Sequence, residues 1–158
     1  MVGLGLCPFA AAPMRGGEVR FALSRAETPG QLIDELLAEI ALLQAPGGPG
    51  TTLLVIPALL AELEDFLDLA AAAEELLEQA GYEGVFQLAS FHPDFRYGEA
   101  LDDPADHVGR SPYPTLHLLR WEDVHRASTT HPDVAGIPDR NARLLRALGE
   151  AGIRRARG

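Results

Sequence analysis

The chain has 158 residues, of which 47% are hydrophobic, and a formal net charge of −10 at pH 7. This length and composition predict one globular domain with a sizeable core and exclude global disorder. The acidic balance argues against a nucleic-acid partner, because neutralising phosphates requires a basic face. The chain also contains no lysine, which excludes Schiff-base catalysis, covalent attachment of pyridoxal phosphate and a Walker-type phosphate loop.

The single cysteine, Cys7, rules out an internal disulfide and indicates a reducing compartment. The apolar N-terminal segment 1–17 has no basic region of the kind that begins a signal peptide, and no apolar run reaches membrane-spanning length. We therefore expect a cytoplasmic protein without a membrane partner. Residues 26–95 carry 13 of the 23 carboxylates and none of the arginines. This asymmetry allows a homo-oligomer, although a solvated helix face is its commoner cause.

The residue pattern predicts strands that alternate with helices. Residues 18–24 are a short β-rich stretch, and Thr28 followed by Pro29 marks the start of a helix with apolar residues at helical spacing. The uninterrupted apolar run 51–57 is typical of a strand buried on both faces. The remaining expected elements are a helix over about 58–80, strands over 84–91 and 115–120, and helices over about 122–130 and 138–149.

This strand–helix–strand–helix–strand order is typical of parallel strands joined by right-handed crossovers. We predict a single α/β domain over 1–158, built as a small three-layer domain with a mostly parallel four-stranded sheet flanked by helices. Residues 150–158 are expected to be a frayed tail. Ligands of such sheets bind beyond the carboxyl ends of the strands, and the third strand ends at His92 in the sequence SFHPD.

The third and fourth strands are joined by residues 93–114, which show no periodic pattern. Connections this long without secondary structure are uncommon in compact domains and are usually functional or disordered. The aromatic residues of this stretch favour packing, and its four prolines stiffen it. We therefore expect an ordered loop that forms a site over the strand ends.

Four side chains around this loop could carry chemistry. Imidazole titrates near neutrality and binds metals when neutral, so His92 is a candidate general base or metal ligand, or else a histidine bonded to nearby backbone. Asp94 could orient the His92 ring or form a local turn. His117 lies inside the fourth strand and Cys7 lies in LCPFA. Each could be functional or an ordinary buried residue, and Cys-Pro pairs also occur where a thiolate binds haem iron.

Three arginines flank apolar or proline-containing stretches, namely Arg110, Arg120 and Arg140. Guanidinium groups bind carboxylates and phosphates in a bidentate way, so a cluster of these arginines would indicate a small anionic substrate. Salt bridges to the surplus acids of the chain are the alternative.

The motifs LCPFA, FQLASFHPDFRY, RSPYPTLHLLR and IPDRN occur in this order between Cys7 and Asn141. Together they resemble a bacterial family catalogued as domain of unknown function 1415. The resemblance brings no reaction with it, but it implies recurrent polar positions, which are occupied here by Cys7, His92, Asp94, Arg110, Ser111, His117, Arg140 and Asn141. The sequence ADHVG stands where the family has an Asn-rich stretch, which allows that His107 was recruited in this chain.

The leading hypothesis is a small-molecule enzyme, an oxidoreductase or a hydrolase, that acts on an anionic substrate. Its catalytic residues would be Cys7, His92, Asp94 and His117. Its substrate-binding residues would be Arg110, Ser111, Arg120, Arg140 and Asn141. Cys7, His92 and His117 would hold zinc, iron or copper, since thiolate and imidazole are suitable ligands for these metals, or the site would use haem.

Two alternatives stay open. In the first, no metal takes part, and Cys7 is the nucleophile of a transferase or hydrolase, with His92 as its base and Asp94 as the orienting group. In the second, the protein is a non-catalytic domain that binds an anion or small molecule through its arginines, while the histidines are structural and Cys7 is buried.

Overall fold

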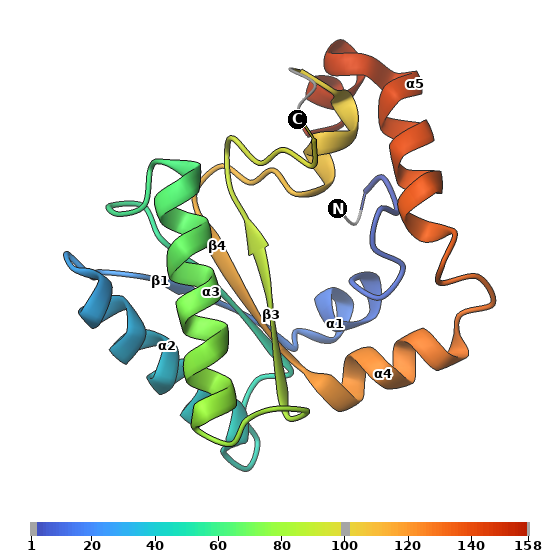
Figure 1. Cartoon of the computed structure of the whole chain (residues 1–158). Helices are drawn as coiled ribbons and strands as arrows, with labels where there is room; N and C mark the ends of the chain where they lie inside the picture. Colours follow the sequence, from blue (N-terminus) through green and yellow to red (C-terminus); the bar gives the residue numbers. More distant parts are fainter. Residues whose placement is uncertain (1–2, 99–101, 158) are drawn as a thin grey trace.

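The computed structural model describes residues 3–98 and 102–157 and consists of a four-stranded sheet with flanking helices (Figure 1). The strands are β1 (Val19–Leu23), β2 (Thr51–Val55), β3 (Phe86–Phe91) and β4 (Thr115–Arg120). The helices are α1 (Ala11–Gly16), α2 (Pro29–Gln44), α3 (Leu63–Gln79), the short 3-10 helix η1 (Pro104–Val108), α4 (Trp121–Thr130) and α5 (Ile137–Arg157). In the part of the chain described, no helix is long and apolar enough to cross a bilayer.

The sheet is mixed, with the strand order β1-β2-β4-β3. β1 and β2 are parallel, whereas β4 runs antiparallel to both β2 and β3. The first three strands therefore point the same way, as their connecting helices led us to expect, but β4 is inserted between β2 and β3. The prediction of a mostly parallel sheet is wrong, because a strand that reverses direction through a loop needs no helical crossover.

One face of the sheet is covered by α2 and α3, and the main core lies between them (Figure 1). Ala22, Leu54 and Leu116 stand side by side on three neighbouring strands and point into this core, each at most 8% exposed. The helices contribute the buried residues Leu32, Leu36, Ile40, Leu43, Phe66, Ala70, Ala73 and Leu77. Their helical spacing is the pattern that predicted both helices from the sequence.

The two core helices begin for different reasons. α2 starts as predicted, with Pro29 as its first residue and the Thr28 hydroxyl accepting a hydrogen bond from the backbone N–H of Gln31 at 3.3 Å. α3 starts at Leu63 and not near residue 58. Leu60 has a φ of 61°, a left-handed conformation that is uncommon outside glycine and cannot continue a right-handed helix.

The opposite face of the sheet is only partly covered. Strand alternation places Phe21, Leu53, His117 and Ala89 in one row across this face. At the β1 edge, Phe21 is 62% exposed and its neighbour Leu23 is 68% exposed. The expected third layer of helices over this face is therefore not confirmed.

A second, smaller core joins the N-terminal segment to α5 and η1 (Figure 1). It contains Leu6 from the N-terminal segment and Ile153 from α5, which is 1% exposed. The chain departs from helical angles at Gly149, with φ 60° and ψ 175°, and then continues as helix to Arg157. Residues 150–157, which we expected to form a frayed tail, are helical, and Gly152 and Ile153 among them are buried.

Candidate functional site

The connection between β3 and β4 is organised by the backbone of its first residue, His92. The His92 N–H donates to the carbonyl of Gly109 at 3.1 Å, and the His92 carbonyl accepts from the N–H groups of Phe95 at 3.2 Å and Ser111 at 3.4 Å. These bonds bring the beginning and the end of the loop together at the carboxyl end of β3. This is the edge of the sheet at which we expected a ligand site.

The side chain of His92 is fully buried, and both of its ring nitrogens bind backbone groups. Nε2 lies 3.1 Å from the carbonyl oxygen of Leu60, to which it donates, and Nδ1 accepts from the N–H of Asp94 at 3.1 Å. The ring packs against Phe66, with the ring centroids 5.2 Å apart. These contacts leave no ring nitrogen for a metal ion or a thiol. These contacts are those of the alternative interpretation, a histidine bonded to nearby backbone.

Asp94 does not orient His92 in the way we expected. The backbone N–H of Asp94 donates the hydrogen bond to the ring, whereas Asp94 itself is exposed and lines a cleft. A local turn was the other interpretation of Asp94, and the N–H of the next residue, Phe95, does close a turn onto the carbonyl of His92.

His117 lies on the partly covered face of the sheet and is a neutral histidine. The Thr51 hydroxyl donates to the carbonyl of Leu118 at 2.5 Å, so it accepts from Nε2 of His117, which lies 2.8 Å away. Burial lowers the pKa of His117 from 6.5 to about 4, because a charged imidazolium would lose its hydration there. The ring lies 6.3 Å from that of Phe91. Near pH 7 this side chain can form hydrogen bonds but carries no charge.

Cys7 is held at the end of a backbone segment that α5 binds directly. Arg140 donates to the carbonyl of Gly5 at 2.7 Å, and the buried amide of Asn141 donates to the carbonyl of Leu6 at 2.6 Å. Cys7 itself is partly exposed. The IPDRN motif thus positions the LCPFA motif, 135 residues away in the sequence for each bonded pair.

The predicted substrate-binding residues do not form one cluster. Arg110 donates through Nε to the carbonyl of Phe95 at 3.1 Å, and the Ser111 hydroxyl donates to the carbonyl of Tyr113, so both act within the loop. Arg120 lies at the other end of β4, where it donates to the carbonyls of Gly50 and Leu43. Arg140 and Asn141 bind the N-terminal segment, as described above.

The predicted metal ligands are not brought together either. Within residues 3–98 and 102–157, no three side chains of His, Cys, Asp or Glu are grouped so that they could hold a metal ion. Cys7, His92 and His117 therefore do not form the three-ligand centre that we expected from the sequence. His92 is the residue that most clearly explains this, because the backbone occupies both of its nitrogens.

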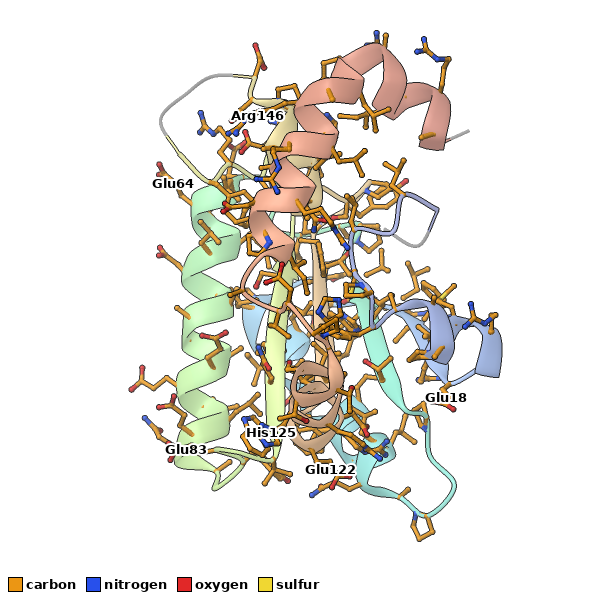
Figure 2. The ribbon with its side chains drawn as sticks, turned by 90° about the vertical axis from the view of Figure 1, so that its right-hand side faces the viewer. Glu18, Glu64, Glu83, Glu122, His125 and Arg146 are labelled. Carbon is orange, nitrogen blue, oxygen red and sulfur yellow. The ribbon has the colours of Figure 1, made fainter. Side chains whose placement is uncertain are left out.

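A cleft of about 600 Å³ lies between the start of α3 and the loop after β3. Five of its lining residues are acids and two are arginines. The full lining consists of Glu62, Leu63, Glu64, Asp65, Asp94, Arg96, Asp102 and Arg110. Figure 2 shows Glu64 toward the end of the molecule where Arg146 of α5 lies, while Glu83 and Glu122 lie at the opposite end. The cleft is therefore confined to one end of the domain, beyond the carboxyl end of β3.

The wall behind the cleft is fixed by polar contacts between the loop and α5. Asp103 caps η1 by accepting from the N–H of Ala105 at 3.0 Å, and it pairs with Arg146 at 2.7 Å. The hydrogen bond from Arg146, followed by that from Ala105, lowers the pKa of Asp103 to about 2. His107, the residue that we considered as recruited in this chain, has Nε2 2.9 Å from Glu150. It thus contacts α5.

Sequence reasoning missed most of the residues that line the cleft. Glu62, Glu64 and Asp65 follow the pattern of a solvated helix face, and an acid facing a cleft has the same spacing as one facing open water. Arg96 carried no local signal other than its position in the long loop. The loop itself was the signal that located the site, since it was predicted to cover the strand ends.

The comparisons with known proteins identify a family but no activity. The family model described as "Protein of unknown function (DUF1415)" matches residues 1–155, so the chain belongs to that family. No curated protein and no solved structure matches this chain. Its function therefore has to be inferred from its own geometry.

We expect His92→Ala to destabilise the protein, because it removes two backbone hydrogen bonds and leaves a cavity beside Phe66. The loss should be about 2–4 kcal/mol in the free energy of unfolding, measured by urea denaturation. His125→Ala is the matched control, since His125 is exposed on α4 and its ring stacks on the exposed Trp121, a contact whose loss should cost at most about 1 kcal/mol. Equal stability of the His92→Ala variant and the wild type would contradict the structural role of His92.

The lowered pKa of His117 predicts a dependence of stability on pH. His117 takes up its proton only near pH 4 in the folded state, but near pH 6.5 in the unfolded chain. The contribution of neutral His117 to the free energy of unfolding is therefore complete above pH 6.5 and is lost as the pH falls toward 4. The loss should amount to at most about 3 kcal/mol. Urea denaturation between pH 7.5 and about 4 should show a smaller decline for His117→Asn than for the wild type. Parallel declines would show that His117 does not titrate in this way.

The contact between Asn141 and Leu6 predicts how accessible Cys7 is. Asn141→Ala should free the segment before Cys7 and raise the rate at which iodoacetamide modifies this single cysteine by several-fold. Mass spectrometry measures the rate without ambiguity, because there is only one thiol. Asp139→Ala, at an exposed position in the same helical turn, is the control and should react like the wild type. An unchanged rate in the Asn141→Ala variant would exclude control of Cys7 by this contact.

Proposed function

We propose that this member of a family of unknown function binds a small molecule carrying both an anionic group and an ammonium group, in the cleft between α3 and the loop after β3. The observation that carries the proposal is the mixed lining of the cleft, in which Arg96 and Arg110 lie among five carboxylates. A purely anionic ligand would meet net negative charge there, and a purely cationic one would approach two guanidinium groups. A ligand with both charges satisfies both parts of the lining.

The anionic group is best placed at Arg96, because the first turn of α3 already carries the carboxylates of Glu64 and Asp65. Arg96 is exposed in the loop, and its guanidinium can bind a carboxylate or phosphate in a bidentate way. This placement agrees with the anionic substrate group expected from the sequence.

The ammonium group is best placed against the carboxylates of the loop. Asp94 and Asp102 are both exposed and both line the cleft. Arg110 is held by the carbonyl of Phe95 and lies 3.5 Å from Asp106. Arg110 therefore adds positive charge to the cleft lining, and we do not expect it to make a direct hydrogen bond to the ligand. The ligand would be recognised by charge and hydrogen bonds, since Leu63 is the only apolar residue that lines the cleft among the residues described.

Enzymatic chemistry at Cys7 is the second candidate function, and one observation favours it. Arg140 and Asn141 hold the two carbonyls that precede Cys7, while Cys7 stays partly exposed. A cysteine presented on a fixed backbone suits a nucleophile or a metal ligand. His92 cannot assist it while its ring is bound to backbone on both sides, so an enzyme of this kind would need another base. We therefore rank binding at the cleft first.

Calorimetric titration with matched small molecules tests the proposal. The panel consists of an amino acid that carries a phosphate or second carboxylate, the same compound without its amine, and the same compound without its acidic groups. We expect binding only of the compound with both charges. Arg96→Gln should weaken it at least about tenfold, the usual scale for losing a charge-assisted hydrogen bond. The control Arg126→Gln changes an exposed arginine on α4 and should bind like the wild type.

Two results would contradict this proposal. In the first, none of the three compounds binds to the wild type. In the second, a compound binds but the Arg96→Gln variant binds it with wild-type affinity, which would place the ligand elsewhere.

A further inference from the structure

The outer edge of β1 presents backbone groups that no other described residue binds. In a parallel pair, every second residue directs its N–H and C=O toward the neighbouring strand. The Glu18 carbonyl accepts hydrogen bonds from the N–H groups of Gly50 and Thr51, and the Ser24 N–H donates to the carbonyl of Val55. The backbone groups of the even-numbered residues of β1 therefore face β2. The backbone groups of Val19, Phe21 and Leu23 therefore point away from the sheet, because β1 is an edge strand.

Little in this edge prevents β1 from pairing with another chain. Natural edge strands are protected by short length, charged side chains, proline, bulges or a covering segment. The five-residue strand VRFAL contains no lysine or proline, its one charged residue, Arg20, is paired with Glu39, and Phe21 and Leu23 are 62% and 68% exposed. The free edge ends at Leu23, because the next outward N–H, that of Arg25, is already bonded to Glu35 at 3.0 Å.

A groove of about 400 Å³ lies between this edge and α2. Arg20 and Arg25 line it together with Glu35 and Glu39 of α2, so the groove is locally neutral in a chain of net charge −10. Arg20 and Glu39 are paired, with Nε 2.8 Å from Oε2. Oε2 of Glu35 is buried and has no hydrogen-bond partner among the residues described. A buried carboxylate oxygen without a donor is costly, so a donor brought to this end of the groove would stabilise the protein.

We propose that the protein forms a two-fold symmetric dimer in which β1 pairs antiparallel with β1 of a second copy, with the two Phe21 residues opposite each other. A two-fold axis perpendicular to the sheet keeps the helical layers of both copies on the same side and sets outward-pointing residues opposite one another. Centring on Phe21 also places Val19 opposite the partner's Leu23. This register uses the free residues and leaves the N–H of Arg25 with Glu35.

The same register provides the missing donor. The partner's Arg20 lies opposite Ala22, whose side chain points to the side of the sheet covered by α2. On that side Glu35 has its unpaired oxygen. Arg20 binds Glu39 of its own copy through Nε and Nη2, so Nη1 of the partner's Arg20 is the group that would donate to Glu35. Arg25 lies beside the partner's Glu18 at the end of the paired segment. Both contacts are repeated by symmetry, and this self-complementarity is the reason to favour a second copy over an unrelated strand.

The dimer would be independent of ligand binding. The cleft lies beyond β3, which is the opposite edge strand of the sheet, so pairing through β1 leaves the cleft open. A failed ligand titration therefore does not bear on the dimer, and a monomeric protein does not bear on the cleft.

Disulfide trapping tests both the interface and its register. In a Cys7→Ser background, which has no other cysteine, Phe21→Cys would place two cysteines in a directly opposed pair. The Cα atoms of such a pair are about 5.5 Å apart, a distance that a disulfide spans. Leu23→Cys is the matched control, because its two copies would be separated by four residues, roughly 13 Å. We expect diamide to convert the Phe21→Cys variant, but not the Leu23→Cys variant, to a covalent dimer.

Analytical ultracentrifugation of the unmodified chain provides the second readout. The wild type should sediment as a dimer, and Phe21→Glu should sediment as a monomer because it opposes two like charges at the interface. Leu67→Glu, which changes an exposed apolar residue on α3, should remain dimeric. The proposal is overturned if the wild type is monomeric throughout the micromolar range, if Phe21→Glu stays dimeric, or if Leu23→Cys cross-links as readily as Phe21→Cys.

Discussion

The buried ring of His92 is the interaction on which the cleft depends. Its Nε2 binds the carbonyl of Leu60, a residue in a left-handed conformation just before α3, and its Nδ1 binds the N–H of Asp94 at the start of the long loop. One imidazole thus joins the two walls of the cleft to the end of β3.

Several polar residues of the recurrent motifs have the same kind of task. Arg120 binds the carbonyls of Leu43 and Gly50, and Arg140 and Asn141 bind those of Gly5 and Leu6. A chain with long irregular segments has many backbone groups without a partner in a helix or sheet, and these must be bonded when they are buried. Long polar side chains provide those bonds, which explains why residues that resemble a catalytic set are distributed over the fold.

Charge acts differently at the two edges of the sheet. Beyond β3, the acids of the α3 start and of the loop outnumber Arg96 and Arg110, which favours a ligand that brings charges of both signs. Beside β1, two arginines and two glutamates are balanced, so the groove itself adds no like-charge repulsion to a contact between two copies. The proposed ligand cleft and the proposed dimer edge thus differ in their local charge.

The sequence by itself determined the features that depend on neighbouring residues. These are the α/β class, the four strands, the Thr28 cap of α2 and the placement of the long loop after His92, because periodicity and capping are local. Only the tertiary structure decided that β4 lies antiparallel between β2 and β3, that His92 binds backbone on both sides, and that Glu64 faces a cleft. Each of these depends on contacts between residues far apart in the chain, which no local pattern encodes.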